Sequence, residues 1–330
     1  MIQVARKLAT PLDYAALPRE ELVERIAARK AELNAVILGH NYQRIDIQEV
    51  SDYLGDSLGL SQEAARTDAD VIVFCGVHFM AETAKVLSPD KMVLMPDLRA
   101  GCPMADFVTG DALRRLKARH PDAAVVAYVN STAEVKAESD VCCTSANAVE
   151  VVNSIPADRT ILFVPDRNLA RHVAEQVPEK TIIPWEGFCY VHQQITPQEI
   201  ERIRQSDPDL EVLVHPECRA DVARLANAVL STSGMVKYAK ERPATRFLVV
   251  TECGLSDRLA MEVPNKTFLK GCKLCTFMKV TTLEDVRDSL QKMQYEIEVP
   301  EDVRLPAERA LRRMFEATEG GTARSEVVRK

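Results

Sequence analysis

The sequence predicts an α/β protein built from three homologous three-layer αβα domains, each with a parallel sheet, arranged around a pseudo-threefold axis. Two observations lead to this prediction. Polar residues recur at almost equal spacing in the three thirds of the 330-residue chain, and an apolar, strand-like segment precedes each of them. Recurrence at one fixed period is the sequence signature of a repeated structural unit.

Three sets of residues follow this period. The cysteines Cys102, Cys189 and Cys275 lie 87 and 86 residues apart. The hydroxyl residues Ser57, Ser145 and Thr232 lie 88 and 87 residues apart. His40, Tyr128 and His215 are also spaced by 88 and 87 residues. So are Tyr42, Asn130 and Glu217, each two positions further along the chain. Equal positions in three copies of one unit predict a shared site where the copies meet.

Each unit opens with an apolar segment that runs into polar residues: AVILGHNY (35–42), AVVAYVN (124–130) and LEVLVHPE (210–217). Such segments are typical of buried parallel strands. A short helical stretch and a turn with a hydroxyl residue follow, so Ser57, Ser145 and Thr232 are expected at or near helix N-caps. Further strands are expected within 71–76, 160–166 and 246–253, and within 92–102, 181–189 and 267–275. The polar residues end these strands, where α/β sheets bind their ligands.

These elements divide the chain into four parts. The first repeat, with an amphipathic N-terminal helix, covers 1–101, the second 102–188 and the third 189–275. A charged helical segment, 276–330, is expected to pack on the first repeat, with the last ten residues frayed.

Composition limits the classes of function. The net charge is −7 with both signs interspersed, so a nucleic-acid partner is not expected. No apolar run reaches the roughly 18 residues that span a membrane, and the N-terminus lacks a signal-peptide pattern. The expected compartment is the cytoplasm, where the nine cysteines would be reduced. Any functional cysteines among them are expected to serve metal ligation or catalysis.

The matched cysteines predict a metal centre, because three thiolates can hold a metal and leave one coordination position open. A [4Fe–4S] cluster with three protein ligands has one iron free to act as a Lewis acid. Zinc also takes three protein ligands in catalytic sites, and the residues alone leave both metals open. Nearby glycines would let the backbone approach a cluster closely.

The other cysteines are expected to serve packing or to lie near the site without ligating. Cys75 is predicted to be a core residue, and Cys142, Cys143, Cys218 and Cys253 are predicted to be non-ligating. Cys272 forms a CxxC motif with Cys275, so it could replace Cys275 as a ligand or pair with it. The repeat spacing favours Cys275.

The polar triplets suit a small substrate with several anionic groups. Hydroxyl and backbone N–H groups at helix N-termini bind carboxylate or phosphate. Tyr42 and Glu217 can carry protons, and His40, His192 and His215 can donate hydrogen bonds or protons.

At these residues the chain resembles the quinolinate synthase family, the iron–sulfur enzymes of NAD biosynthesis. The matching stretches include LGHNYQ, GDSLGLSQEAA, MPDLRAGCPMAD, AYVNSTAEVKAESDVCCTSANA, WEGFCYVH, VHPEC, STSGM and CKLCTFMK. They run from about residue 35 to residue 280. The resemblance implies three homologous α/β domains and one [4Fe–4S] cluster between them, held by Cys102, Cys189 and Cys275.

The resemblance also implies a reaction and its residues. The family condenses iminoaspartate with dihydroxyacetone phosphate to quinolinate, with loss of phosphate and two waters. Its substrate contacts fall on His40, Tyr42, Ser57, Tyr128, Asn130, Ser145, His192, His215, Glu217 and Thr232. We expect Tyr42 and Glu217 to perform acid–base steps while His40 and His215 orient the substrate. A transient contact with L-aspartate oxidase, which produces iminoaspartate, is a further expectation. Some members carry CxxCxxC where this chain has only CKLC, which puts redox control through that pair in doubt.

Two other functions remain open at this point. One is a cluster-dependent hydro-lyase that acts on another small hydroxy acid. The other is an iron–sulfur redox sensor in which CKLC is the switch, although the chain shows no basic or DNA-binding motif to serve a sensor.

Overall fold

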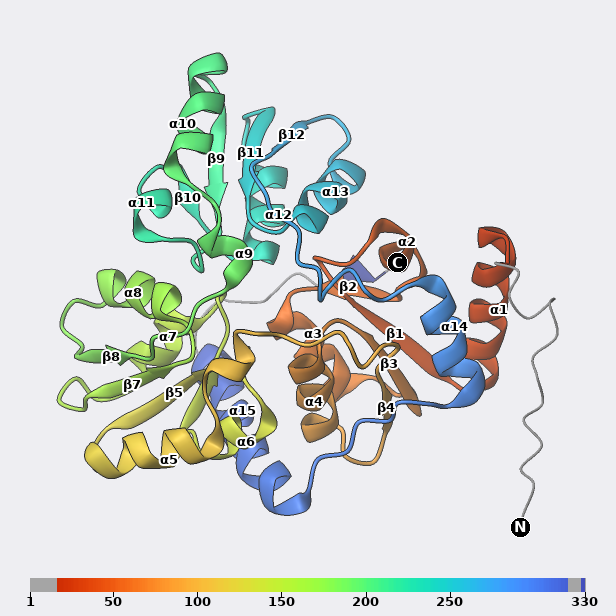
Figure 1. Cartoon of the computed structure of the whole chain (residues 1–330), viewed down its shortest axis with the longest axis horizontal. Helices are drawn as coiled ribbons and strands as arrows, with labels where there is room; N and C mark the ends of the chain where they lie inside the picture. The colour runs from red at the N-terminus through yellow and green to blue at the C-terminus, as the bar shows by residue number, and fades with distance from the viewer. Residues whose placement is uncertain (1–16, 320–327, 330) are drawn as a thin grey trace, which may run out of the picture.

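Each third of the chain forms its own four-stranded parallel sheet with helices packed against it (Figure 1). The structure is a computed structural model that describes residues 17–319 and 328–329. The parallel strands have the orders β2-β1-β3-β4, β6-β5-β7-β8 and β10-β9-β11-β12, and an antiparallel fifth strand, β13 (Val328–Arg329), joins the first sheet beside β2. Each order runs second, first, third, fourth, so the three units share one topology. The predicted fold class is therefore confirmed, while the domain boundaries drawn from the spacing stay predictions.

The first unit contains α1 (Arg19–Glu32), β1 (Ala35–His40), α2 (Ile45–Val50), β2 (Tyr53–Gly55), α3 (Ser57–Arg66), β3 (Val71–Cys75), α4 (His78–Leu87) and β4 (Met92–Leu94). Successive side chains of β1 face opposite sides of the sheet, as the pleat requires. Ile37 packs with Leu22 and Ile26 of α1, whereas Leu38 packs with Leu58 of α3 and the helices beyond it. Both faces of the sheet are therefore covered, which explains why β1 and β3 are apolar almost throughout.

The second unit begins with a short 3₁₀ turn, η2 (Ala105–Phe107). It continues with α5 (Gly110–Arg119), β5 (Ala124–Tyr128), α6 (Ala133–Ala137), β6 (Val141–Cys143), α7 (Ala148–Asn153), β7 (Ile161–Val164), α8 (Arg167–Gln176) and β8 (Ile182–Pro184). Every residue of β5 and β7 is buried.

The third unit contains α9 (Tyr190–Gln193), α10 (Pro197–Ser206), β9 (Glu211–Val214), α11 (Ala220–Ala223), β10 (Ala228–Val229), α12 (Thr232–Glu241), β11 (Arg246–Val250), α13 (Cys253–Glu262) and β12 (Thr267–Lys270). Its sheet also separates two apolar clusters, one with α10 and α11 and one with α12 and α13. The nine strands expected from the sequence are all present. The short strands β2, β6 and β10 were not expected, because two or three residues carry too little periodicity to be seen.

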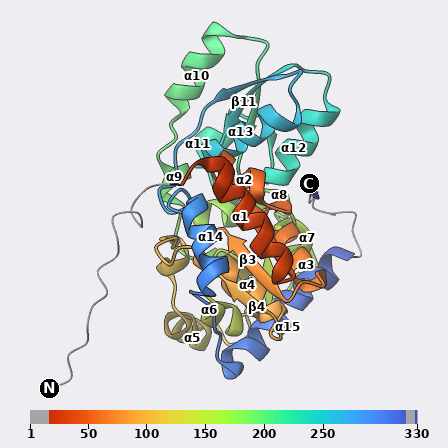
Figure 2. The ribbon, with the colours of Figure 1, turned by 90° about the vertical axis from the view of Figure 1, so that its right-hand side faces the viewer.

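The C-terminal segment divides between two units. Helix α14 (Leu283–Lys292) lies beside α1 on the first unit (Figure 2). Helix α15 (Glu301–Glu319) packs instead mainly against α6 and β6 of the second unit and also touches α4. The expectation that the whole segment packs on the first repeat is thus wrong for α15, whose apolar face fits the junction of two units. None of the helices within residues 17–319 combines the length and the apolar character needed to cross a membrane.

The predicted fraying of the last ten residues also needs correction. Strand β13 (Val328–Arg329) pairs antiparallel with β2, through Leu54 and Tyr53. The rest of that stretch, 321–327 and 330, lies outside the described residues. At least part of the C-terminus therefore extends the first sheet.

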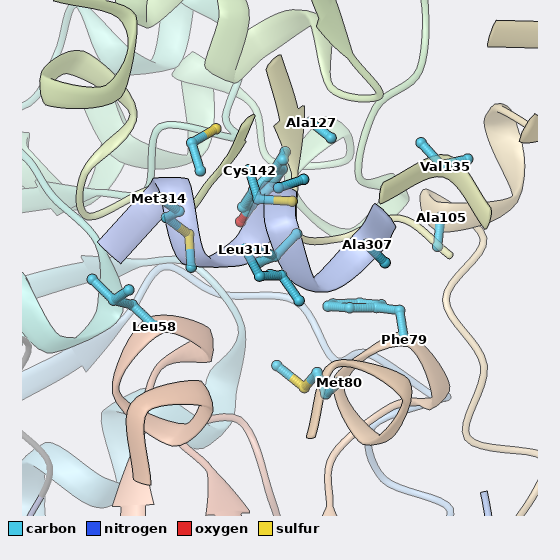
Figure 3. Packing of buried hydrophobic residues seen from close by; sticks show 14 of the residues in the cluster. Leu58, Phe79, Met80, Ala105, Ala127, Val135, Cys142, Ala307, Leu311 and Met314 are labelled. Carbon is cyan, nitrogen blue, oxygen red and sulfur yellow. The ribbon is translucent and has the colours of Figure 1, made fainter. Parts of the chain in front are cut away.

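Leu311→Ala is expected to lower the free energy of unfolding by about 2–5 kcal/mol, the usual cost of a cavity in a packed core. Leu311 is fully buried and lies among Met314, Cys142 and Phe79 between the first two units (Figure 3). Urea unfolding followed by circular dichroism would measure the change. The matched control is Leu305→Ala on the same helix, where a side chain 45% exposed should cost less than about 0.5 kcal/mol. Equal losses in both variants would contradict the packing described here.

Candidate active site and metal centre

A cavity lies at the carboxyl ends of the strands where the three units meet. All ten residues predicted to contact a substrate line it: His40, Tyr42, Ser57, Tyr128, Asn130, Ser145, His192, His215, Glu217 and Thr232. The repeat spacing therefore identified residues that the structure brings together from all three units.

Two of the three hydroxyl residues are left free to face this cavity because other side chains cap their helices. Ser57 is the first residue of α3, and Asp56 before it accepts a hydrogen bond from the Gly59 N–H at 2.9 Å. Thr232 likewise begins α12, behind the capping residue Ser231. Ser145 lies just ahead of the short helix α7. Ser57 and Thr232 therefore lie one residue inside the caps, where their hydroxyls remain available to a ligand.

Glu217 is the centre of the polar network in the cavity. Its Oε1 accepts hydrogen bonds from the Tyr128 hydroxyl at 2.6 Å and from Asn130 Nδ2 at 3.3 Å. Its Oε2 lies 2.8 Å from His192 Nδ1. Burial would raise the pKa of Glu217, but His192, His215 and the Tyr128 hydroxyl outweigh it and hold this pKa below its ordinary value. The carboxylate is therefore ionised at neutral pH and can only accept.

His40, His215, Tyr42 and Tyr128 are neutral at neutral pH. Burial lowers the pKa of His40 and of His215 to about 3. Burial, followed by the nearby charge of Glu217, raises the pKa of Tyr42 and of Tyr128 well above 10. Since each neutral ring or hydroxyl has a proton to give, these groups suit hydrogen bonding to oxygen atoms of a ligand.

No lysine or arginine is among the residues that line the cavity in the described chain. The ionisable carboxyl groups there are those of Asp56, Glu217 and Glu252. Lys279 lies behind the cavity lining, where it forms an ion pair with Glu252 at 3.1 Å. An anionic ligand would therefore be held by neutral donors, by helix N-termini and by a metal centre, and not by direct ion pairs.

His40→Asn is expected to make the protein less sensitive to acid. The folded-state pKa of His40, about 3, lies below the unfolded value of 6.5, so the unfolded chain takes up a proton first as the pH falls. This linkage lowers the free energy of unfolding of the wild type by about 1 kcal/mol between pH 7.5 and pH 5.5. The variant lacks this contribution, so its free energy of unfolding should fall by about 1 kcal/mol less over the same range. Urea unfolding of the metal-free chain at both pH values would test this. An identical loss in both proteins would show that His40 is protonated in the folded state.

The three matched cysteines differ from the other free cysteines in their exposure. Cys102, Cys189 and Cys275 are partly exposed, whereas the other four free thiols are buried. Burial of the sulfur raises the pKa of Cys102 to about 12, with Cys275 adding to the effect, and Cys102 in turn adds to the raised pKa of Cys189. The thiols are thus close enough to influence one another. Cys189 and Cys275 also line the cavity.

These observations fit an iron–sulfur cluster, since Cys189 and Cys275 line the cavity and Cys102 lies close enough to interact electrostatically with both. Beside Gly101, an added Cβ would meet only Phe277, at 4.0 Å, so there is open space next to Cys102. Gly187 has a different role from the one expected, because a Cβ there would lie 2.4 Å from the Pro165 carbonyl oxygen. It permits close packing of two chain segments.

A second group of possible ligands overlaps the first. The ligand atoms of Cys189, His192 and Glu217 lie within 4.8 Å of one another. A thiolate, an imidazole and a carboxylate are a donor set that zinc accepts. The geometry thus supports a metal site among these residues.

The expectation that all cysteines are reduced is wrong for two of them, because Cys253 and Cys272 form a disulfide. Cys253 follows β11 and Cys272 follows β12. These strands are parallel neighbours, so their carboxyl ends carry the two thiols together. Cys272 is consequently neither a free ligand nor a partner of Cys275, and a redox switch within CKLC does not match this structure.

Two groups of residues near the cavity were not predicted from the sequence. Thr251, directly after β11, is fully buried and bonds to Tyr42 and His192. Asn41 donates from Nδ2 to Thr232 Oγ1 at 2.7 Å, while its Oδ1 accepts from the buried Arg258. Because arginine only donates, it fixes the amide so that Thr232 keeps its own proton for a ligand. Neither Thr251 nor Arg258 has a counterpart in the other units, so no spacing could indicate them.

Fold and cavity together define an α/β protein of three equivalent units, with a central cavity lined by carboxyl, imidazole, phenol and hydroxyl groups and by two of the matched thiols. Residues 24–316 match the family model described as "Quinolinate synthetase A protein". The chain belongs to this family.

Relatives named quinolinate synthase are similar to this chain over most of their length. The chain is 51% identical over 301 residues to "Quinolinate synthase 1" of Methanosarcina acetivorans, covering 91% of this chain and 98% of the relative. It is 53% identical over 295 residues to the "Quinolinate synthase" of Thermodesulfovibrio yellowstonii, covering 89% and 97%. For the protein of that name from Geobacter metallireducens, the identity is 54% over 286 residues, covering 86% and 93%.

Proposed function

We propose that this protein condenses iminoaspartate with dihydroxyacetone phosphate to quinolinate, with loss of phosphate and two waters, in the cytoplasmic synthesis of NAD. Family membership supports the reaction. The observation that supports the same reaction in this chain is the central cavity, where the proposed acid–base residues and the hydroxyl residues of all three units lie together with Cys189 and Cys275. Transient delivery of iminoaspartate by L-aspartate oxidase is part of the proposal.

The cofactor we propose is a [4Fe–4S] cluster held by Cys102, Cys189 and Cys275. When bound, it supplies an iron with an open coordination position that acts as a Lewis acid. Zinc is the alternative metal, because Cys189, His192 and Glu217 form a suitable group.

The side chains have separate tasks in this proposal. Ser57, Ser145 and Thr232 donate hydrogen bonds to the carboxylate and phosphate oxygens, aided for Ser57 and Thr232 by the helix N-termini. His40 and His215 are neutral and orient the substrate by hydrogen bonds. Glu217 and Tyr42 take up and return the protons that the two dehydrations require. Burial of these groups excludes water, which protects an imine that hydrolyses readily.

The test is product analysis with anaerobically purified, cluster-loaded protein. Iminoaspartate would be generated in place and mixed with dihydroxyacetone phosphate, and quinolinate and phosphate would be quantified. Equal amounts of both products are expected. Turnover of a hydroxy acid without release of phosphate would indicate a hydro-lyase, and the absence of any turnover by cluster-loaded protein would refute the proposal.

A further inference from the structure

The same backbone hydrogen bond ties each of the three matched cysteine segments to the start of a helix. In every unit, the first residue of the helix that follows the third strand donates its N–H to the carbonyl two residues before the cysteine. The three pairs are His78 with Ala100 at 2.8 Å, Arg167 with Gly187 at 2.9 Å and Cys253 with Lys273 at 3.3 Å. The residues just before these donors, which are the N-cap residues of α4, α8 and α13, therefore hold equivalent positions: Val77, Asp166 and Glu252.

Glu252 uses its two carboxylate oxygens for different partners. The residue is buried. Its Oε1 accepts a hydrogen bond from the backbone N–H of Cys275 at 3.1 Å. Its Oε2 accepts from the Gly254 N–H at 2.7 Å and from Lys279 at 3.1 Å. One oxygen thus caps α13, while the other holds the backbone of a predicted cluster ligand.

Lys279 extends this contact to the first unit. Its ammonium group also bonds to the backbone carbonyl of Tyr42, in the segment that follows β1. The chain segments approach closely here, since a Cβ added to Gly254 would lie 2.6 Å from that carbonyl oxygen. The pair of Glu252 and Lys279 therefore connects Cys275 to the first unit. The positive charge also offsets that of the carboxylate, which would otherwise repel a thiolate close by.

The equivalent residues of the other two units hold their cysteines less firmly. Asp166 is fully buried and caps α8 through the Leu169 N–H at 2.6 Å. Its carboxyl group lies close enough to the Cys189 N–H to interact with it, but Oδ2 has no hydrogen bond of good geometry. Val77 has no polar side chain to offer to Cys102. The carboxylate contact is thus fully formed in the third unit alone.

We propose that Glu252 is a positioning residue for Cys275 and holds it where its thiolate binds iron. This inference rests on the proposed cofactor. The hydrogen bond fixes the backbone of the cysteine, so its Sγ cannot move away without breaking a charge-assisted bond. The disulfide restrains Cys272 instead, so it does not replace this contact. Groups that orient a metal ligand in this way affect how tightly the metal is held.

Glu252→Gln separates the two tasks of the carboxylate. The amide oxygen of glutamine can still accept from Gly254 and Lys279, which leaves its NH₂ group facing the N–H of Cys275, where neither group accepts. Cluster-loaded Glu252→Gln is therefore expected to release its iron to EDTA roughly 10- to 100-fold faster than wild type. Cluster absorption recorded without oxygen would measure the rate, and circular dichroism would establish that the variant is folded.

Asp56→Asn is the matched control for this change. Asp56 is also a buried carboxyl group beside the cavity that caps a helix, through the Gly59 N–H. No cysteine is among its hydrogen-bond partners in the described part of the chain, so its variant should release iron at the wild-type rate. An unchanged rate in Glu252→Gln, or an equal acceleration in Asp56→Asn, would overturn the proposal.

If Glu252→Gln does not fold, Glu252→Asp provides a second comparison. Aspartate already caps α8 in the second unit, so α13 should keep its cap while the shorter side chain weakens the contact with Cys275. Iron should again be released faster than from wild type, and release at the wild-type rate would count against the proposal.

A second measurement separates this inference from the proposed cofactor. Hydrogen exchange followed by mass spectrometry should show a protected N–H at Cys275 in the wild type. A further amide in the peptide that contains Cys275 should exchange rapidly in Glu252→Gln and stay protected in Asp56→Asn. If the wild type takes up no iron–sulfur cluster, the proposed cofactor fails, yet exchange in the metal-free chain still decides whether Glu252 holds Cys275. Unchanged exchange of this peptide in Glu252→Gln would refute the contact.

Discussion

Alanine at Cys102, Cys189 or Cys275 is expected to abolish the cluster altogether. Wild-type protein purified without oxygen should contain the four irons and four sulfides of a [4Fe–4S] cluster, and each variant should contain essentially none. Two thiols cannot hold three of the four irons, and no other free thiol of this chain is partly exposed as these three are. Quinolinate formation should disappear together with the iron.

Electronic absorption with iron and sulfide analysis would measure this effect. Cys75→Ala is the matched control, because Cys75 is a free thiol buried in β3 and its loss should leave the iron content unchanged. A single zinc per chain would replace the cluster with the alternative metal. A cluster that survives loss of Cys275 but not of Cys272 would contradict both the ligand assignment and the disulfide.

Glu217→Gln is expected to reduce kcat by about 10²–10⁴-fold, the usual contribution of a general acid–base residue. The amide has nearly the same shape and can still accept from Tyr128, so the fold should persist. It can neither take up a proton nor accept from His192 through its NH₂ group. The loss should therefore fall on kcat more than on KM.

Steady-state kinetics on cluster-loaded protein would measure the change. The matched control is Glu199→Gln, which removes a carboxylate of the same unit that pairs with Lys273 on the surface and should leave kcat unchanged. Tyr42→Phe should cause a loss comparable to that of Glu217→Gln. Near-normal turnover in both Glu217→Gln and Tyr42→Phe would show that the acid–base assignment is wrong.

The sequence predicted those features that repeat. A strand buried on both faces, such as β1, must be apolar along its length, and the residue at its carboxyl end is free to be polar. Three copies of that pattern therefore identified the sheets and the residues at their edges. Ser57 and Thr232 were found in the same way, although Asp56 and Ser231 proved to be the capping residues.

Features that occur once could not be predicted in this way. The disulfide joins cysteines 19 positions apart, and only the pairing of β11 with β12 makes them neighbours. Thr251 is a single hydroxyl after an apolar strand, which is as typical of a strand end as of a functional residue. The position of α15 depends on the junction of two units, and its own amphipathic pattern does not indicate which surface it covers.

The common strand order of the three units has a consequence for how a substrate is oriented. Matching positions carry His40, Tyr128 and His215, and two places later Tyr42, Asn130 and Glu217. The backbone repeats in the three units, but the functional groups differ. At the second of these positions the units carry a phenol, a neutral amide and a carboxylate, respectively. A ligand rotated by one third of a turn about the pseudo-threefold axis would meet equivalent backbone but different hydrogen-bonding side chains. The departure of the side chains from the symmetry of the backbone thus makes the three possible orientations of a ligand in the cavity unequal.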